Sequence, residues 1–469
     1  MRLVPAATLC VLMAVLLLPL LSLAGSYSHY DTLVISSIKI EGNKKTKDYI
    51  VLRELTINTG DTLSHQELLV ELGISRENLL RLPLFHFVDI RVDTMSQNRE
   101  AAITIQLTER WYTWIWPVFE ISDRNFNTWL ENGDLTRLSY GLFFQQENFR
   151  GRLEKLHLRI KAGYQQQISL LYEAPYLNRT KTLGAGVLVN VARERETAFI
   201  TRENSLEYFR HSEFLRKFTE AGLFIRYRPG IHTSHTLTAQ LNHYQFSDTL
   251  IALNPDYAGI ALRETTLPSL TYLMKADHRD QRAYPLSGWY ADLLAEWAGI
   301  VNQADFDYLT LRASARIHHP LTERWNLAAG VAGKISTKGN KPWFRNQALG
   351  YGRDYVRGYE YQVVDGDNFW LLKANLKYAL VPLKIFKAGK IKAGQFNTIP
   401  FSMHVGVYAD AGKTWPAQNT EINSLQQKLL AGAGLGLDFV TYYDKVMRAE
   451  FSVNREGKAG FFLHFMAAI

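Results

Sequence analysis

The sequence of 469 residues is almost free of cysteine: Cys10 is the single one, inside an apolar stretch at the N-terminus. A lone cysteine excludes a disulfide framework and a metal site built from several cysteines. Motifs of serine hydrolases, zinc proteases and phosphate loops are also absent. The pattern Gly432-x-Gly434-x-Gly436 has the wrong spacing for a dinucleotide site and indicates a strand in which packed side chains need room. We therefore expect no enzyme activity, no cofactor and no metal ion.

Long apolar runs are missing beyond residue 24. Residues 3–24 are apolar, follow Arg2 and end in Ser22-Leu23-Ala24, which predicts a signal peptide at 1–24. An uncleaved membrane anchor is the alternative, because the run is long enough to span a bilayer. The rest of the chain has no stretch of 18 apolar residues. The mature protein is therefore either secreted and soluble or a membrane protein that crosses with strands.

Runs of charge are missing as well. The formal net charge is +8, yet the basic residues are dispersed along the chain. This distribution argues against a nucleic-acid partner and fits a polar interior or contact with anionic lipid head groups. Aromatic residues make up 12% of the chain, which fits strands that face lipid and fits an aromatic-rich soluble β protein equally well.

Residues 31–110 have the pattern of one small α/β domain. Ser64 followed by Glu67 is a capping box, which predicts a helix from Ser64 through Leu72. Further helices are expected at 46–55 and 76–82, and strands at 34–40, 86–92 and 102–108. The segments IKIEGNKKT, TGDTLS, LLRLPLFHFVDIRVD and ITIQLTER resemble a POTRA domain, and an unrelated α/β spacer is the alternative. The resemblance implies exposed strand edges that pair with client or accessory proteins.

Residues 111–469 alternate between apolar and polar side chains. In residues 155–162, leucine, isoleucine and alanine alternate with lysine, histidine and arginine. A soluble sandwich alternates in the same way, but strands of about 9–12 residues also match the thickness of a bilayer. Sixteen strands are expected, an even number as in bacterial outer-membrane barrels. They are 113–121, 134–145, 153–162, 165–174, 182–192, 217–228, 236–245, 266–277, 287–299, 306–319, 323–335, 368–380, 400–410, 430–440, 446–454 and 459–466.

The expected connections alternate in length. Long outer loops are expected at 193–216, 246–265, 336–367 and 411–429, and most other connections are short periplasmic turns. Segment 381–399 is an exception, a long basic connection on the periplasmic side. The expected fold class is mainly β: a sixteen-stranded transmembrane antiparallel β-barrel at 111–469, preceded by one small α/β POTRA-like domain at 31–110.

Four stretches resemble the BamA/TamA superfamily of outer-membrane assembly and translocation proteins. They are FFQQENFRG at 143–151, DHRDQRAYPLSG at 277–288, Val356-Arg357-Gly358-Tyr359, and Tyr408-Ala409-Asp410-Ala411-Gly412. The last strand, with Gly460, Leu463 and Phe465, looks like the C-terminal signal strand of such barrels, although four residues follow Phe465.

The resemblance implies that 336–367 is a lid loop folded into the barrel. Its motif Val356, Arg357, Gly358 and Tyr359 would bring Arg357 against Asp410, because a guanidinium in a narrow lumen needs a carboxylate partner. Arg353 receives no partner by this argument. The turn motif Asp277, Arg279, Asp280, Pro285 and Gly288 is expected to hold a periplasmic turn in shape rather than to perform chemistry.

The same resemblance implies a function in outer-membrane protein assembly or translocation. The barrel would lie in the bacterial outer membrane with its N-terminal domain in the periplasm, and a seam between the first and last strands would open sideways. Its partners would be outer-membrane lipids, unfolded outer-membrane or secreted client proteins, and accessory proteins at the POTRA-like domain. The alternative is a passive channel whose lumen favours anions because of Arg159, Arg226, Arg312 and Arg316.

Overall fold

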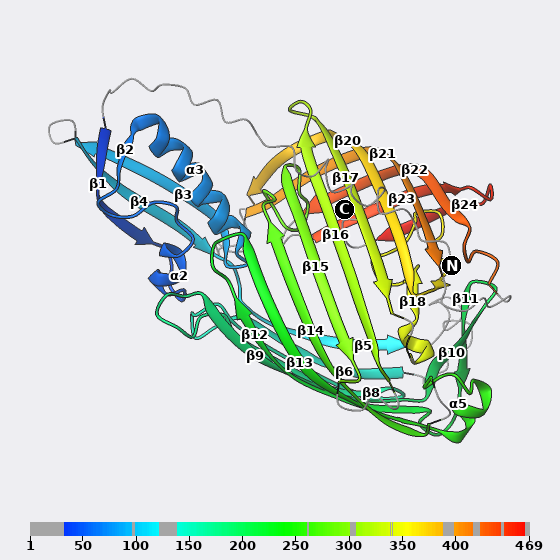
Figure 1. The fold of residues 1–469 in the computed structure, drawn as a ribbon. Helices are drawn as coiled ribbons and strands as arrows, with labels where there is room; N and C mark the ends of the chain where they lie inside the picture. Colours follow the sequence, from blue (N-terminus) through cyan, green and yellow to red (C-terminus); the bar gives the residue numbers. More distant parts are fainter. Residues whose placement is uncertain are drawn as a thin grey trace.

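A computed structural model describes most of the chain between residues 32 and 464. The described residues are 32–95, 99–121, 138–259, 262–300, 306–337, 339, 341–387, 398–415, 423–441 and 445–464. The expected signal peptide at 1–24 and Phe465 of the C-terminal motif lie outside them. Within these residues the chain forms a small α/β module followed by a large sheet (Figure 1).

The module is a four-stranded sheet with the order β2-β1-β4-β3 and two helices. Its core is built from apolar side chains of both helices and of the inner strands β1 and β4. No helix among the described residues is long and apolar enough to cross a membrane. The elements are β1 (Thr32–Glu41), α2 (Asp48–Leu52), β2 (Thr62–Ser64), α3 (His65–Arg81), β3 (Phe85–Met95) and β4 (Glu100–Glu109).

The capping box of Ser64 and Glu67 is present at the start of α3. The expectation of two separate helices at 64–72 and 76–82 was wrong, because α3 continues through both segments. Gly73 lies between them, and it costs a helix only about 1 kcal/mol relative to alanine. Burial of Leu68, Leu72 and Leu79 along one side of α3 outweighs that cost.

The large sheet contains sixteen described strands, and every neighbouring pair is antiparallel. The sheet curves into a barrel (Figure 1), which confirms the expected fold class. The strands are β5 (Thr113–Ile121), β6 (Leu138–Phe149), β7 (Glu154–Gly163), β8 (Gln166–Ala174), β9 (Leu183–Glu194), β12 (Arg216–Tyr227), β13 (Thr233–Phe246), β14 (Glu264–Asp277), β15 (Gly288–Ala298), β16 (Tyr308–Pro320), β17 (Trp325–Ser336), β20 (Asn368–Lys387), β21 (Thr398–Trp415), β22 (Leu429–Thr441), β23 (Lys445–Asn454) and β24 (Ala459–His464).

The barrel has its apolar side chains outside and many of its charges inside. On β21, Val407 is 50% exposed, whereas its neighbour Tyr408 and the nearby Asp410 are buried. Because successive side chains of a strand point to opposite faces, the same alternation separates an apolar outer surface from a polar interior. A sheet with an apolar outer face and buried charges is the reverse of a water-soluble protein and fits a lipid environment.

Segment 381–399 was expected to be a connection, and that expectation was wrong at both of its ends. β20 extends to Lys387 and β21 begins at Thr398, so residues 381–387 and 398–399 belong to strands, and residues 388–397 lie outside the described residues. Register shifts between Ala379 and Val381 and between Val381 and Lys384 break the regular ladder. These shifts and Pro382 interrupt the alternation from which the strand ends were predicted.

The two ends of the barrel carry different structures (Figure 1). At one end, the turns after β6, β8 and β12 contact the module. At the other end, the long connections form small elements of their own, as Figure 1 shows for β10, β11 and α5. These elements are β10 (Glu196–Arg202), β11 (Ser205–Arg210), α5 (Asp248–Leu253), η2 (Trp343–Arg345), β18 (Gln347–Leu349) and β19 (Val364–Asp365).

Candidate functional site: the internal loop and the two edge strands

The loop between β17 and β20 is packed inside the barrel. Its side chains Val356 and Tyr359 are buried in an apolar cluster that includes Leu371 on β20 and Leu430 on β22. The short strands β18 and β19 pair with each other and so connect the two ends of the loop segment 350–363. A solvated outer loop would leave these apolar groups in water, so burial against the wall stabilises the inward position.

Arg357 is the most deeply buried charge among the described residues of the loop, and it contacts Asp410 on β21. Its Nε donates to Asp410 Oδ2 at 2.8 Å, and its Nη2 donates to Oδ1 at 2.5 Å. The backbone N–H of Arg357 adds a third hydrogen bond to Oδ2 at 3.1 Å. The guanidinium also lies 3.8 Å from the centre of the Tyr408 ring. The structure thus brings together the two residues that the motif resemblance had paired.

Two glycines allow the loop to lie this close to the wall. Gly358 has φ +93°, a left-handed conformation that other residues adopt with strain. A β-carbon on Gly432 of β22 would lie 1.9 Å from the carbonyl oxygen of Arg357. The room that the glycines of β22 provide is therefore used, at Gly432, by the backbone of the loop itself.

Glu450 on β23 extends the Arg357–Asp410 pair into a longer network that the sequence did not reveal. Its Oε1 lies 3.4 Å from Arg357 Nη1 and 3.5 Å from Arg448 Nη1. Arg448 in turn donates to both oxygens of Asp438 on β22, at 2.5 and 3.0 Å. The signal that could have found these residues is the polar side chain at every second position of 448–454, alternating with apolar ones.

The turn between β14 and β15 contains the predicted turn motif. Arg279 donates to both carboxylate oxygens of Asp277, at 2.7 and 2.9 Å. Asp280 accepts the backbone N–H groups of Gln281 and Leu286, at 2.8 and 3.1 Å. Pro285 is buried and Gly288 begins β15. These contacts are local hydrogen bonds that shape a turn.

Tyr284 in the same turn reaches the network from the other end of the barrel. Its hydroxyl donates to Asp438 Oδ2 at 2.6 Å, and its ring lies 4.9 Å from that of His404. Lys377 lies 4.5 Å from the centre of the same ring. Tyr284 lies in the stretch 277–288, but the sequence did not assign it a contact, because its partner is 154 residues away. The loop and the turn are therefore joined through the side chains of β21, β22 and β23.

The arginines predicted to line an anion-favouring lumen are engaged by other side chains. Arg312 forms a two-pronged pair with Asp354 of the loop, at 2.7 and 2.9 Å, and contacts Asp292. Arg226 pairs with Glu173. Arg159 and Arg316 lie over the rings of Phe143 and Tyr290. Two of the four charges are thus compensated by carboxylates.

The sheet has two ends within the described residues, at β5 and at β24. β5 forms a ladder with β6 and β24 forms one with β23, and no ladder joins β5 to β24 in this part of the chain. Pro117 lies within β5, a position that proline tolerates in an edge strand. Gly460 and Leu463 of the C-terminal motif lie in β24. Among the described residues, one edge of β5 and one edge of β24 are therefore not part of a ladder.

The module is attached to the barrel by polar contacts. Arg228, after β12, donates to both carboxylate oxygens of the buried Glu54 at 2.6 and 2.8 Å. Arg81 of α3 lies 2.9 Å from Nδ1 of His232, in the turn between β12 and β13. Burial lowers the pKa of His232, and Arg81 and Arg228 lower it further. A cavity of about 630 Å³ lies beside these contacts.

Comparisons with known proteins agree with this geometry. Residues 148–441 match the model of the Omp85 superfamily domain, and residues 33–110 match the POTRA model, described as a surface antigen variable number repeat. A search of the curated proteins found no match.

Two solved structures share the fold at low sequence identity. BamA from Haemophilus ducreyi lacking POTRA domains 1–3 superposes with a TM-score of 0.51 and 16% identity, over 92% of this chain and 83% of that one. CdiB from Escherichia coli gives 0.53 and 12%, over 92% and 75%. Together with the match over more than half of the sequence, the architecture shows that the chain belongs to the Omp85 superfamily of outer-membrane β-barrel proteins and carries one POTRA domain.

Proposed function

We propose that this protein inserts or translocates client proteins at the outer membrane, by pairing a client strand with the edges of β5 and β24. The observation that carries the proposal is the pair of ladder ends at these two strands in the described part of the sheet. An edge strand offers a row of unpaired N–H and C=O groups, which is the template for an added strand.

A lipid environment increases the free energy gained when a strand pairs with such an edge. Hydrocarbon cannot satisfy backbone hydrogen bonds, so an open edge within a bilayer costs several kcal/mol for each unpaired group. A client strand that pairs with the edge removes this cost. Burial of the client's own apolar side chains then supplies the driving force, without nucleotide hydrolysis or a cofactor.

The surroundings of β5 suit this role. Ile115 and Phe119 of β5 are exposed, and they point to the same, outer face of the barrel as Tyr140 of β6. Trp114 and Trp116, whose ring centroids are 5.0 Å apart, alternate with them and point to the opposite face. In this proposal the barrel lies in the bacterial outer membrane, and the outward rings of Phe119 and Tyr140 loosen the lipid next to the edge.

The module provides the contact with periplasmic partners in this proposal. Its sheet ends at β2 and β3, and β3 has eleven residues against three for β2. A long edge pairs with an extended chain over more hydrogen bonds than a short one. We expect accessory proteins or arriving clients to pair with β3 while the module lies in the periplasm.

Site-specific photo-cross-linking tests the pairing. A photoreactive amino acid is placed at Phe119 on β5 or at Phe461 on β24, which are 69% and 67% exposed, and client adducts are identified after pulse labelling. The matched control is Leu223 on β12, also 67% exposed but in the middle of the sheet. Client adducts at both edges and none at Leu223 are expected. Equal labelling at all three positions would show that clients are not selected by the edges.

Depletion of the protein separates the possible client ranges. Loss of many barrel proteins from the outer membrane marks a general insertase, and loss of one secreted protein marks a dedicated translocator. An unchanged outer-membrane and secreted proteome would rule out both.

A passive anion channel is the rival function, and single-channel recording distinguishes it. The buried loop and the compensated charges of Arg226 and Arg312 argue against steady anion flow. The proposal predicts small, intermittent currents in the wild-type protein. Large, steady, anion-selective currents would favour the channel instead.

A further inference from the structure

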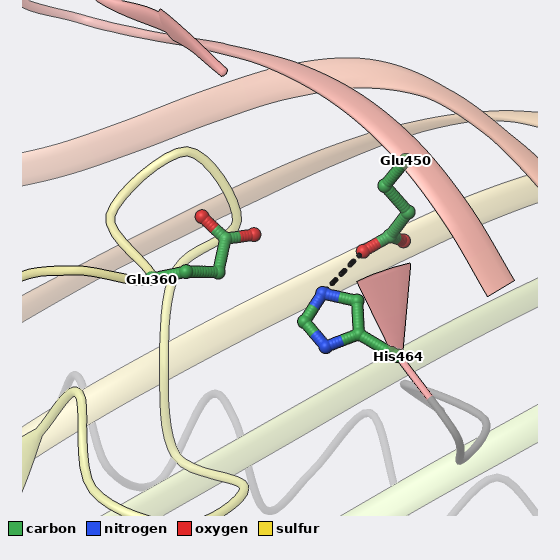
Figure 2. Close-up of side chains that lie close together, drawn as sticks. All are labelled: Glu360, Glu450 and His464. Carbon is green, nitrogen blue, oxygen red and sulfur yellow. Dashed lines mark ion pairs between the residues drawn. The ribbon is translucent and has the colours of Figure 1, made fainter. Parts of the chain in front are cut away.

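Three side chains from three different elements converge inside the barrel, next to the Arg357–Asp410 pair (Figure 2). Glu360 belongs to the internal loop, Glu450 to β23 and His464 to the end of β24. One oxygen of each carboxylate and one nitrogen of the imidazole lie within 4.8 Å of one another. The arrangement links the loop to the last described strand, which Asp410 and Arg357 do not reach.

Each residue of the cluster also contributes a buried polar atom without a regular hydrogen bond to a described residue: Oε1 of Glu360, Oε2 of Glu450 and Nε2 of His464. The last two lie 3.2 Å apart and form an ion pair (Figure 2). Buried polar atoms normally have a partner, and leaving one without costs about 1–3 kcal/mol. Three such atoms that face one another indicate a ligand between them.

The other oxygen of each carboxylate is already held by the protein. Glu360 Oε2 accepts the backbone N–H of Gly358 at 2.7 Å. Glu450 Oε1 faces the guanidinium groups of Arg357 and Arg448. The ring of Tyr355 stacks on that of His464 at 5.9 Å. These contacts orient the three free ligand atoms, as the outer partners of metal ligands commonly do.

The charges around the cluster leave room for a cation. Arg357 and Arg448, the two guanidinium groups beside Glu450, are paired with Asp410 and Asp438. Two further ammonium groups lie over tyrosine rings, that of Lys373 4.0 Å from Tyr355 and that of Lys377 4.5 Å from Tyr284. Glu450 faces these two guanidinium groups and His464, whereas Glu360 forms no ion pair within the described residues. Repulsion between the two carboxylates favours a cation between them.

The chemistry of the donors selects the kind of cation, and the spacing of one donor pair matches it. Glu450 Oε2 and His464 Nε2 are 3.2 Å apart. Two ligands of a tetrahedral Zn²⁺, each about 2.1 Å from the metal, are separated by about 3.4 Å. Imidazole with carboxylates suits Zn²⁺ and other first-row transition metals, whereas Mg²⁺ and Ca²⁺ prefer oxygen alone.

We propose that Glu360, Glu450 and His464 bind a divalent transition-metal cation, with Zn²⁺ as the reference ion, which fastens the internal loop to β24. The site goes beyond the proposed function, since it does not depend on which client is handled. Bound metal favours the state in which the loop is inside the barrel and β24 is paired with β23. Removal of the metal releases β24 from the loop, which the Arg357–Asp410 pair still holds inside the barrel.

Titration of the purified full-length protein tests the site. After chelation and dialysis, Zn²⁺ is added to the protein in detergent and heat is measured by calorimetry. One site per chain is expected for the wild type, with at least tenfold weaker binding in His464→Gln and Glu360→Gln. His243→Gln is the matched control, because His243 lies 3.3 Å from Glu264 in an exposed pair, and it should bind like the wild type. Mg²⁺ should give no heat.

Two readouts do not depend on how the variants fold. Co²⁺ added to the wild type should give the visible absorption of a tetrahedral site and lose it when Zn²⁺ is added. Zn²⁺ should also slow hydrogen exchange of residues 459–464. Absence of Zn²⁺ binding by the wild type overturns the proposal and leaves a proton shared by Glu450 and His464 as the explanation of their contact. Equal binding by the wild type, His464→Gln and Glu360→Gln also overturns it.

Discussion

A two-pronged pair of an arginine and a carboxylate occurs at two places in this protein. One pair holds the internal loop, and the other joins the module to the barrel. At the internal loop, the side chains of Arg357 and Asp410 are 1% and 0% exposed. At the joint between module and barrel, those of Arg228 and Glu54 are 17% and 1% exposed. Both have two hydrogen bonds of similar length, so burial and surroundings are what distinguish them.

The difference lies in what happens when a pair is broken. A charge that loses its partner inside the barrel stays buried and unsolvated. A charge at the joint becomes hydrated when the module moves away. The loop contact should therefore behave as a permanent part of the fold and the joint as a reversible attachment.

Arg357→Ala should have the largest effect. It leaves Asp410 without its partner and Glu450 with one guanidinium fewer, which costs about 3–5 kcal/mol for a buried pair. Thermal unfolding and the amount of folded barrel in the membrane measure the loss. Asp410→Ala should act similarly, and the double variant should lose clearly less than the sum of the two. A strictly additive double variant would contradict the coupling of the two residues.

Gly432→Ala should displace the loop without removing any charge. The new β-carbon would lie 1.9 Å from the Arg357 carbonyl oxygen, and such overpacking costs about 1–3 kcal/mol. Gly436→Ala is the matched control on the same strand, because its nearest atom would be 3.7 Å away. Limited proteolysis of the loop should become faster in the first variant only. Equal rates of proteolysis in the two variants would contradict the close contact between the loop and β22.

Glu54→Gln should loosen the joint by a smaller amount. Loss of the charge pair with Arg228 is expected to cost roughly 1–2 kcal/mol, between the values of exposed and buried pairs. Hydrogen exchange at the turn 228–232 should rise while the unfolding of the barrel stays unchanged. Glu41→Gln, which removes the exposed pair with Lys39, is the control and should leave the turn as it is. A drop in barrel stability would mean that the joint is part of the barrel fold.

A pH effect at the joint should be the smallest. The pKa of His232 is lowered by burial and by Arg81 and Arg228, and that of His278, stacked on it at 4.1 Å, is lowered as well. The released histidines take up protons near their ordinary pKa of 6.5 while the docked ones resist. Docking is therefore full above pH 6.5 and weakens as the pH falls below it. Hydrogen exchange at pH 7.5 and 5.5 measures this, and the change should shrink in His232→Gln.

The sequence was sufficient for the repeating parts of the fold. Alternation along each strand located all sixteen strands, because one face of every strand is apolar over most of its length. The predicted ends of elements were wrong where the pattern is interrupted but the element continues. This occurs at Gly73 within α3 and at Pro382 within β20. In both cases packing or pairing further along the chain continues the element.

The candidate site was only partly accessible from the sequence. The partners Arg357 and Asp410 followed from a motif resemblance and not from any local pattern. Tyr284, Glu450 and His464 were missed, since their contacts join segments that lie far apart in the chain. A period of two tells which side chains face the interior, but it contains no information on which inward side chains meet across it.

The network that runs from Asp410 through Glu450 to Asp438 has a mechanical consequence. The loop and the turn that carries Tyr284 enter the barrel from opposite ends, yet both are hydrogen-bonded to the wall formed by β21, β22 and β23. This wall adjoins the edge strand β24. In the sideways opening that we propose, an outward movement of this wall would pull on the loop and on the turn at once, so that opening of the edge and clearing of the lumen would occur together.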